Sequence, residues 1–272
     1  MNVSTMIGFV ASMLIFVSAL FTSAKNASTF IDFHAILIVL GGTAAASCSC
    51  FSLPKLFELV GVFLRRMVGQ KKNDYFGLIN EIVALAKAYR KGRPTFEAHL
   101  KTISDPFLRD GAEVLFFMEA DIDGDDLRDL LDTRAETHFE RYLAQAEQFR
   151  TISKFPPAFG LMGTTLGMIA LLQALGNPNS KNMIGPSMSI ALVATLYGIF
   201  MSNFIFIPIA ENLTQQTHED LVGRRMVVEG LLLIAAGKPT MFIEEKVKSF
   251  LLPGERMPSN LSAAVPDKKA AA

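Results

Sequence analysis

Charge is missing from four long parts of this 272-residue chain, although its 26 basic side chains balance 26 acidic ones. The stretches without any Asp, Glu, Lys or Arg cover residues 1–24, 33–54, 155–180 and 182–210. Each is long enough to hold the roughly 20 apolar residues that cross a bilayer as a helix. The sequence therefore predicts four transmembrane helices, at about residues 4–22, 34–52, 156–176 and 185–209.

Two other interpretations of these stretches are weaker. Helices buried in a large soluble core are usually shorter and are interrupted by charge. A cleavable signal peptide would need a basic leading region and a small-x-small cleavage site before Lys25, and neither is present. We therefore expect the first segment to remain in the mature chain as a transmembrane helix.

The chain also lacks the motifs on which most enzyme and metal sites depend. It has no glycine-rich phosphate loop, no HExxH and no Ser-His-Asp arrangement, so we predict no enzyme activity and no catalytic residues. Its two cysteines, Cys48 and Cys50, have no His or Cys partners close by in the sequence, which supports neither a disulfide framework nor zinc. The stretch DIDGDD (121–126) carries its Gly at the wrong position for a calcium loop, and we interpret it as the start of a helix. No metal, cofactor or nucleic-acid partner is expected.

The distribution of Lys and Arg predicts the orientation in the membrane. The segment 55–154 carries 16 basic residues and 211–272 carries 8, whereas the two short connections between spans carry only Lys25 and Lys181. Basic residues that flank transmembrane helices are retained on the cytoplasmic side. The sequence thus predicts that both large polar segments and both termini lie in the cytoplasm, with the two short connections on the opposite side of the membrane.

An all-α organisation follows from the helical spacing of apolar residues and from Gly and Pro at the breaks. Leu78, Ile82 and Leu85 share one helical face, Asp105 precedes Pro106 as a helix start, and helices break at Gly92 and at Gly237. We predict a first transmembrane hairpin, a cytoplasmic helical domain, a second hairpin, C-terminal cytoplasmic helices and a disordered tail. Their respective bounds are 1–54, 55–154, 155–210, 211–252 and 253–272.

The predicted spans contain hydroxyl groups but no ionisable Asp, Glu, Lys or Arg. Hydroxyls of Thr164, Thr165 and Thr195 could replace part of the hydration shell of a cation. They could instead bond back to their own helix and serve packing alone. The glycines around Thr164 favour a close helix–helix interface whose polar part is formed by these hydroxyls.

Two prolines lie near the predicted cytoplasmic ends of the third and fourth spans. Pro157 and Pro208 each remove one backbone hydrogen bond. They could simply mark the helix ends at the membrane interface, or they could act as hinges that pass movement from the spans to the cytoplasmic helices.

Four blocks of sequence carry a family resemblance that extends over nearly the whole chain, up to about residue 252. They are FIDFHAILIVLGGTAAA (30–46), FPPAFGLMGTTLGM (155–168), GPSMSIALVATLYGIFMSNFIFIPIAENL (185–213) and EGLLLIAAGKPTMFIEEKVKSFL (229–251). In this order, and with two spans on each side of a cytoplasmic domain, they resemble the MotA/PomA family of flagellar stator subunits.

The resemblance implies a function and a set of partners. It implies five copies of the chain around two copies of a single-span MotB/PomB-like partner, whose membrane aspartate carries the ion. Ion passage along the third and fourth spans would drive rotation, and the cytoplasmic domain would act on the rotor protein FliG. By position in the family's motif, Arg90, Lys91 and Glu97 would face the rotor, and Pro157 and Pro208 match the family's two prolines.

The identity of the ion is left open between H+ and Na+. Thr164 and Thr195 lie where sodium-driven members carry hydroxyls, which slightly favours sodium, although a proton route tolerates threonine too. Thr165 departs from the family, since an apolar residue is usual there. Two alternatives to a stator also stay open: a three-span ExbB/TolQ-like energiser of outer-membrane processes, and a membrane scaffold without ion flow.

Overall fold

The structure, a computed structural model, describes residues 3–23, 30–68, 74–117, 123–176 and 182–253. Within these ranges the regular structure is entirely helical, which confirms the predicted all-α class. The chain divides into two compact units, which are described separately: unit 1 comprises residues 1–72 and 141–216, and unit 2 comprises residues 73–140 and 217–272.

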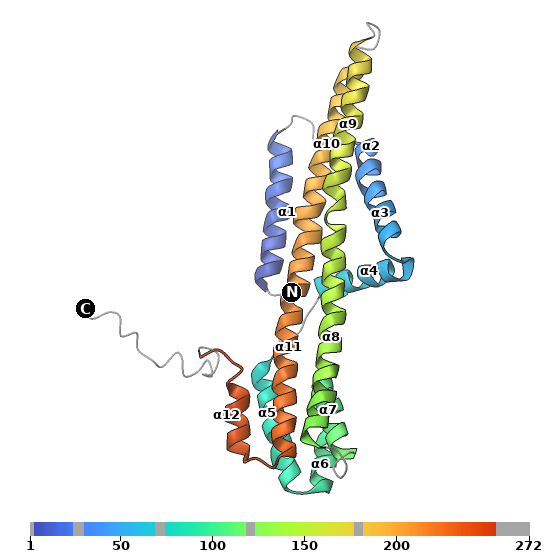
Figure 1. The fold of residues 1–272 in the computed structure, drawn as a ribbon. Coiled ribbons are helices and arrows are strands. Elements are labelled where there is room, and N and C mark those ends of the chain that lie inside the picture. Colours follow the sequence, from blue (N-terminus) through green and yellow to red (C-terminus); the bar gives the residue numbers. More distant parts are fainter. Residues whose placement is uncertain (1–2, 24–29, 69–73, 118–122, 177–181, 254–272) are drawn as a thin grey trace, which may run out of the picture. The chain divides into compact units, whose positions relative to one another are not determined.

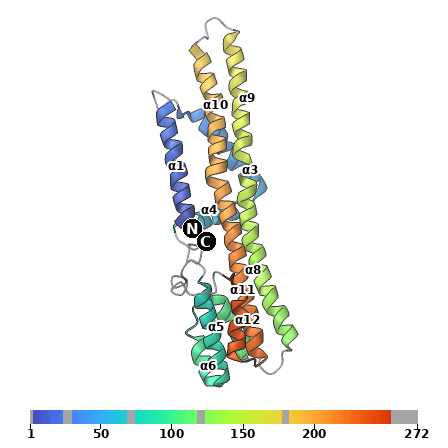
Figure 2. The same ribbon diagram turned by 90° about the vertical axis from the view of Figure 1, so that its left-hand side faces the viewer.

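The centre of unit 1 is a hairpin of two apolar helices, α9 (Phe155–Leu175) and α10 (Ile184–Phe200). They lie side by side along their length in both views of the ribbon (Figures 1 and 2). α9 follows the end of α8 (Gly124–Ile152), and α10 continues through a π-helical segment, η4 (Met201–Phe206), into α11 (Ile207–Ala235).

Other helices of unit 1 pack around this hairpin. α1 (Val3–Ser23) contacts it where Phe16 stacks on Phe200, with 4.2 Å between the ring centroids. The second predicted span consists of α2 (Phe33–Ile36), a π-helical segment η2 (Leu37–Gly41) and α3 (Gly42–Cys50). It is followed by α4 (Leu53–Val68), which runs across the direction of α3 (Figure 1).

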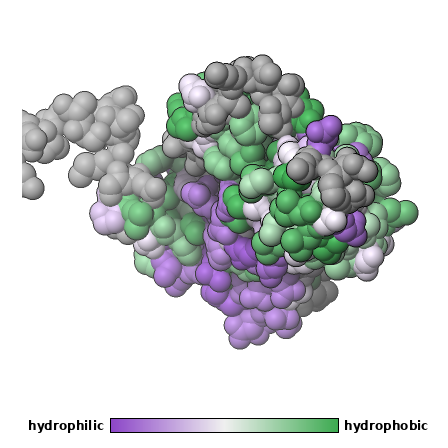
Figure 3. Space-filling view, turned by 90° about the horizontal axis from the view of Figure 1, so that it is seen from above, coloured by the Kyte–Doolittle hydropathy of each residue, from purple (hydrophilic) through white to green (hydrophobic). Residues whose placement is uncertain are grey.

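The apolar helices of unit 1 suit a bilayer. Among the described residues, three helical stretches are long and apolar enough to cross a membrane: Phe33–Cys50, Gly124–Leu175 and Ile184–Ala235. α1 adds 21 residues without a charged side chain. Many large apolar side chains of α9 are exposed, and much of the surface seen in Figure 3 is hydrophobic. The four-span layout and the cytoplasmic location of 55–154 stay predictions.

Unit 2 is built around a conventional hydrophobic core. Its helices are α5 (Tyr75–Arg90), α6 (Arg93–Leu100), α7 (Pro106–Phe117), α12 (Thr240–Lys248) and the adjoining parts of α8 and α11. Large side chains such as Ile82, Leu131 and Leu231 are fully buried among them.

The helix limits in unit 2 agree with the sequence. Gly92 takes a φ of 107°, which an L side chain rarely adopts, directly after α5 ends. The carboxylate of Asp105 accepts the backbone N–H of Leu108 at 2.7 Å and so caps α7. α11 ends at Ala235, before Gly237 and Pro239, and α12 then begins.

Some predictions fall on parts of the chain outside the described residues. The tail expected to be disordered is described only at Pro253, and residues 121–122 of the acidic stretch are also outside. The rest of that stretch opens α8 as expected, with the Asp123 carboxylate accepting the N–H of Gly124 at 2.7 Å.

Candidate functional site: the polar seam of the α9–α10 hairpin

Small residues let α9 and α10 approach each other closely. A Cβ atom added at Gly163 would lie 2.4 Å from the Cβ of Ala194, and one added at Gly167 would lie 2.7 Å from the carbonyl oxygen of Ser187. At Gly160 it would lie 3.0 Å from the carbonyl oxygen of Ala194. The close interface predicted from the glycines is therefore present, and no larger residue fits there without movement of a helix.

Two of the three predicted hydroxyls meet inside this interface. The Oγ1 atoms of Thr164 and Thr195 are 2.8 Å apart. Both also reach the carbonyl oxygen of Gly160, at 3.0 Å from Thr164 and 3.3 Å from Thr195. Both side chains are half-buried, so three oxygen atoms from two helices gather at one partly accessible point.

The third hydroxyl lies elsewhere. Thr165 is exposed, and its Oγ1 donates to the carbonyl oxygen of Met162 in its own helix at 2.7 Å. Consecutive residues of an α-helix point about 100° apart, so two adjacent threonines cannot both face α10. Within a single chain, Thr165 is thus separated from the pair formed by Thr164 and Thr195.

The carbonyl oxygen of Gly160 and the hydroxyls of Thr164 and Thr195 form a polar strip between α9 and α10, which we call the polar seam. Hydroxyl and carbonyl oxygens can replace water around a cation, but they cannot hold a proton or neutralise a charge at ordinary pH. The sequence of α9, α10 and η4 offers no Asp, Glu, Lys or Arg for that purpose. A charge-carrying group would have to come from outside these segments.

Both predicted hinge prolines coincide with departures from regular α-helix. Pro157 follows the break between α8 and α9, where the N–H of Lys154 bonds to the carbonyl of Thr151 at 3.2 Å instead of one residue further back. Pro208 lies just after η4, the π-helical segment. The sequence reasoning missed η4, although a proline inside a helical pattern is a known cause of such local changes.

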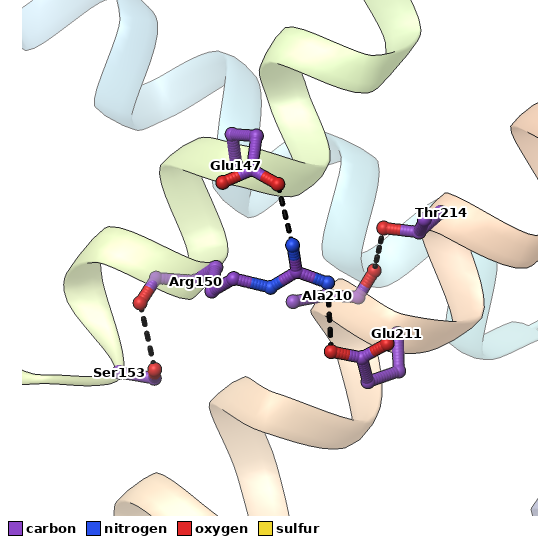
Figure 4. Close-up of polar contacts among 6 residues, drawn as sticks. All are labelled: Glu147, Arg150, Ser153, Ala210, Glu211 and Thr214. Carbon is purple, nitrogen blue, oxygen red and sulfur yellow. Dashed lines mark hydrogen bonds and ion pairs between the residues drawn. The ribbon is translucent and has the colours of Figure 1, made fainter.

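A cluster of charges where α8 ends and α11 begins was also missed. The guanidinium of Arg150 bonds to the carboxylates of Glu211 at 2.7 Å and Glu147 at 2.5 Å (Figure 4). The hydrogen bond to Glu211, followed by the attraction of both carboxylates, raises the pKa of Arg150. The sequence did contain a hint, because Arg150 lies within one turn before Lys154, where one uncharged stretch begins, and Glu211 directly follows another.

The predicted rotor-facing residues belong to unit 2 and are exposed. Arg90 ends α5, with its guanidinium 3.5 Å from the carbonyl oxygen of Gly237, and Lys91 follows it. Glu97 pairs loosely with Lys101 at 3.8 Å. Beside them is an open groove of about 370 Å³ between α5 and α6. Its lining residues are Ala84, Lys87, Ala88, Lys91, Thr95, Ala98, His99 and Thr102.

Fold and seam together define a class: an all-helical membrane protein whose paired spans carry hydroxyls along a closely packed interface. Residues 99–226 match the MotA/TolQ/ExbB proton channel family. Motility protein A of Borreliella burgdorferi is 32% identical over 96% of this chain and 98% of its own length. Chemotaxis protein PomA of Vibrio alginolyticus is 29% identical, over 94% of this chain and 98% of its own.

A solved structure agrees with these relatives. A chain of the flagellar MotAB stator complex from Bacillus subtilis superposes with a TM-score of 0.81, at 25% identity, over 93% of this chain and 98% of that one. The chain belongs to the MotA/PomA family of flagellar stator subunits, as the sequence blocks indicated.

Proposed function

We propose that this chain is the channel-forming subunit of a flagellar stator in the bacterial inner membrane. With a single-span MotB/PomB-like partner it forms a cation channel, and ion flow through that channel is converted into torque on the rotor. It has no catalytic residues and no bound cofactor, and its cargo is H+ or Na+. Both termini lie in the cytoplasm, since 24 of the 26 basic residues flank the spans on that side.

One observation carries the proposal beyond family membership. The Thr164–Thr195 hydroxyl pair lies in a partly accessible seam that has oxygen ligands but no ionisable group. Membrane routes for protons and for ions that drive movement are typically marked by an Asp or Glu carboxylate that binds and releases the ion. A wall that lacks this carboxylate requires a neighbouring chain to supply it, which fits a partner with a single acidic span.

The assembly follows from the same reasoning and from the relatives. The solved structure that superposes on this chain is a MotAB complex, which supports a MotB-like partner here. We propose five copies of the chain around two copies of the partner, as the family resemblance implies. The rotor protein FliG would meet the exposed charges Arg90, Lys91 and Glu97.

The competing candidates differ in what they predict. An ExbB/TolQ-like energiser is favoured only by the family match to residues 99–226, whereas the likeness to Motility protein A also covers the first hairpin. A non-conducting scaffold would use the threonines for packing alone. Deleting the gene separates these cases: loss of swimming with intact outer-membrane uptake supports a stator, and the reverse result supports an energiser.

The ion and the role of the hydroxyl pair are tested together. The chain is co-expressed with its single-span partner in a strain without stators, and swimming is measured in sodium-free and sodium-rich media. We expect swimming to rise with sodium, and Thr195→Ala to shift or abolish that dependence. The exposed hydroxyl provides the control, because Thr165→Ala removes a bond within its own helix. Unchanged torque of Thr195→Ala at both sodium levels would remove the ligand role.

A further inference from the structure

Pro157 leaves one buried carbonyl group without its helical partner. In an α-helix the carbonyl of residue 153 accepts the N–H of residue 157, but proline has no N–H. Ser153 is only 4% exposed, so water does not readily replace the missing donor. A buried backbone carbonyl of this kind needs a hydrogen bond from another group.

Ser202 provides that hydrogen bond from the neighbouring helix. Its hydroxyl donates to the carbonyl oxygen of Ser153 at 2.7 Å, and Ser202 itself is 5% exposed. Within a membrane, serine side chains of adjacent helices commonly satisfy groups that proline has freed. The bond joins the α8–α9 break to the π-helical segment η4.

The backbones are also in close contact one turn away. A Cβ added at Gly198 would lie 2.4 Å from the carbonyl oxygen of Pro156 and 3.2 Å from the Cα of Pro157. Gly198 and Ser202 are four residues apart and so share one face of their helix. The bond between η4 and the α8–α9 break is therefore accompanied, one turn away, by a close backbone contact between α10 and the start of α9.

Each proline acts on one of these segments. Pro157 removes the donor to Ser153, and Pro208, which follows η4, likewise has no N–H to donate back into that segment. Helix segments with interrupted hydrogen bonding are where a helix bends most easily. Since Ser202 lies in one such segment and bonds to the other, a movement of either bend is passed directly to the second helix.

We infer that Ser202 is a coupling residue: its hydroxyl takes the place of the N–H that Pro157 lacks and fastens the two proline-associated bends to each other. This rests on the proposed stator function, because it assigns Ser202 a part in converting ion flow into movement. Ser202 is a positioning residue in this role and does not contact the ion.

The first experiment compares torque with ion flow in the complete complex of the chain and its single-span partner. Ser202→Ala should lower the torque on a tethered bead by about threefold or more, while cation flux per complex in vesicles stays within about twofold of the wild type. Ser202→Thr keeps a hydroxyl and should restore torque. The matched control is Ser47→Ala, because Ser47 is also buried but its hydroxyl donates to the carbonyl oxygen of Thr43 in its own helix, at 2.7 Å.

Three outcomes would overturn the inference. Torque and flux could fall by the same factor, both could stay unchanged, or the Ser202→Ala chain could fail to accumulate in the membrane. The last result would assign the bond to folding alone.

A second experiment does not depend on ion flow. Pro157→Ala returns an N–H that can bond to the carbonyl of Ser153, so Ser202→Ala should lower the thermal midpoint of the solubilised complex less in that background than in the wild type. If Ser202→Ala lowers the thermal midpoint equally in both backgrounds, the Ser202 hydroxyl does not replace the N–H that Pro157 lacks. If the wild-type complex neither conducts nor restores swimming, the proposed function fails, while this thermodynamic cycle still tests the link between Pro157 and Ser202.

Discussion

The two units of this chain use opposite packing rules. In unit 2 many large apolar side chains, such as Ile82 and Leu231, are fully buried in one core. In the α9–α10 hairpin of unit 1 the helix contacts are made by glycine and alanine, while Leu161 and Leu172 are 64% and 63% exposed. In water the hydrophobic effect drives large apolar side chains into a core. Lipid tails are as apolar as these side chains, so burial gains nothing there, and close contact between small residues holds the helices together instead.

The largest effect on stability is expected in the core of unit 2. Leu231→Ala leaves a cavity in this core, next to Gly111 of α7, and should cost about 2–5 kcal/mol of unfolding free energy. Leu172→Ala on the outward face of α9 is the matched control and should cost less than about 0.5 kcal/mol. Thermal unfolding of the solubilised chain measures both. Equal losses would show that the outward face of α9 is packed like a core.

The next largest effect on stability is expected from adding a methyl group where α9 and α10 are in close contact. Gly198→Ala places a methyl group against backbone atoms of Pro156 and Pro157, and overpacking of this kind costs about 1–3 kcal/mol. Gly41→Ala, also in a membrane helix, meets nothing within 4 Å and should be tolerated. The amount of each variant in the membrane and its thermal midpoint are compared. Normal behaviour of Gly198→Ala would contradict the close contact of the two helices.

A smaller and salt-dependent effect is expected from the charges around Arg150. Glu211→Gln removes one exposed partner of the guanidinium and should lower the thermal midpoint slightly at low salt but not at high salt. The raised pKa of Arg150 keeps it charged, and stability linked to it would be lost only as the pH rises through that pKa, far above neutrality. Arg150 therefore stays charged between about pH 6 and 9, and its titration should not alter the difference in thermal midpoint between the wild type and Glu211→Gln in that range. A salt-independent loss would indicate a packing role instead.

The smallest effect on stability, but a large effect on torque, is expected at the exposed charges of unit 2. The double variant Arg90→Glu with Glu97→Lys should assemble and unfold like the wild type, because both side chains are exposed. On an unaltered rotor it should lose most of its torque, since the charge pattern that we propose faces the rotor is reversed. Swimming at wild-type speed would remove these residues from the proposed rotor surface.

The helical class and most helix limits were predictable because they depend on local features. Asp105 caps its own helix and Gly92 supplies a positive φ, and both can be recognised from a few neighbouring residues. The charge-free stretches likewise marked the apolar helices of unit 1. Family membership, which the comparisons confirm, rested on blocks of sequence in a fixed order.

Contacts between helices were harder to predict. That Thr164 rather than Thr165 meets Thr195 depends on the rotation of α9 against α10, which sequence spacing alone does not determine. The bond from Ser202 to Ser153 joins residues 49 positions apart and depends on η4, whose π-helical form has no simple sequence pattern. The missing N–H of Pro157 was visible in the sequence, but its replacement was not.

The central claim is that this chain forms the wall of a cation route and borrows the ion-carrying carboxylate from a partner. Cation flux into vesicles that contain the purified chain alone, compared with vesicles that contain the chain with its single-span partner, tests this most directly. The account predicts flux only when the partner is present. Flux of the same size through the chain alone would contradict it.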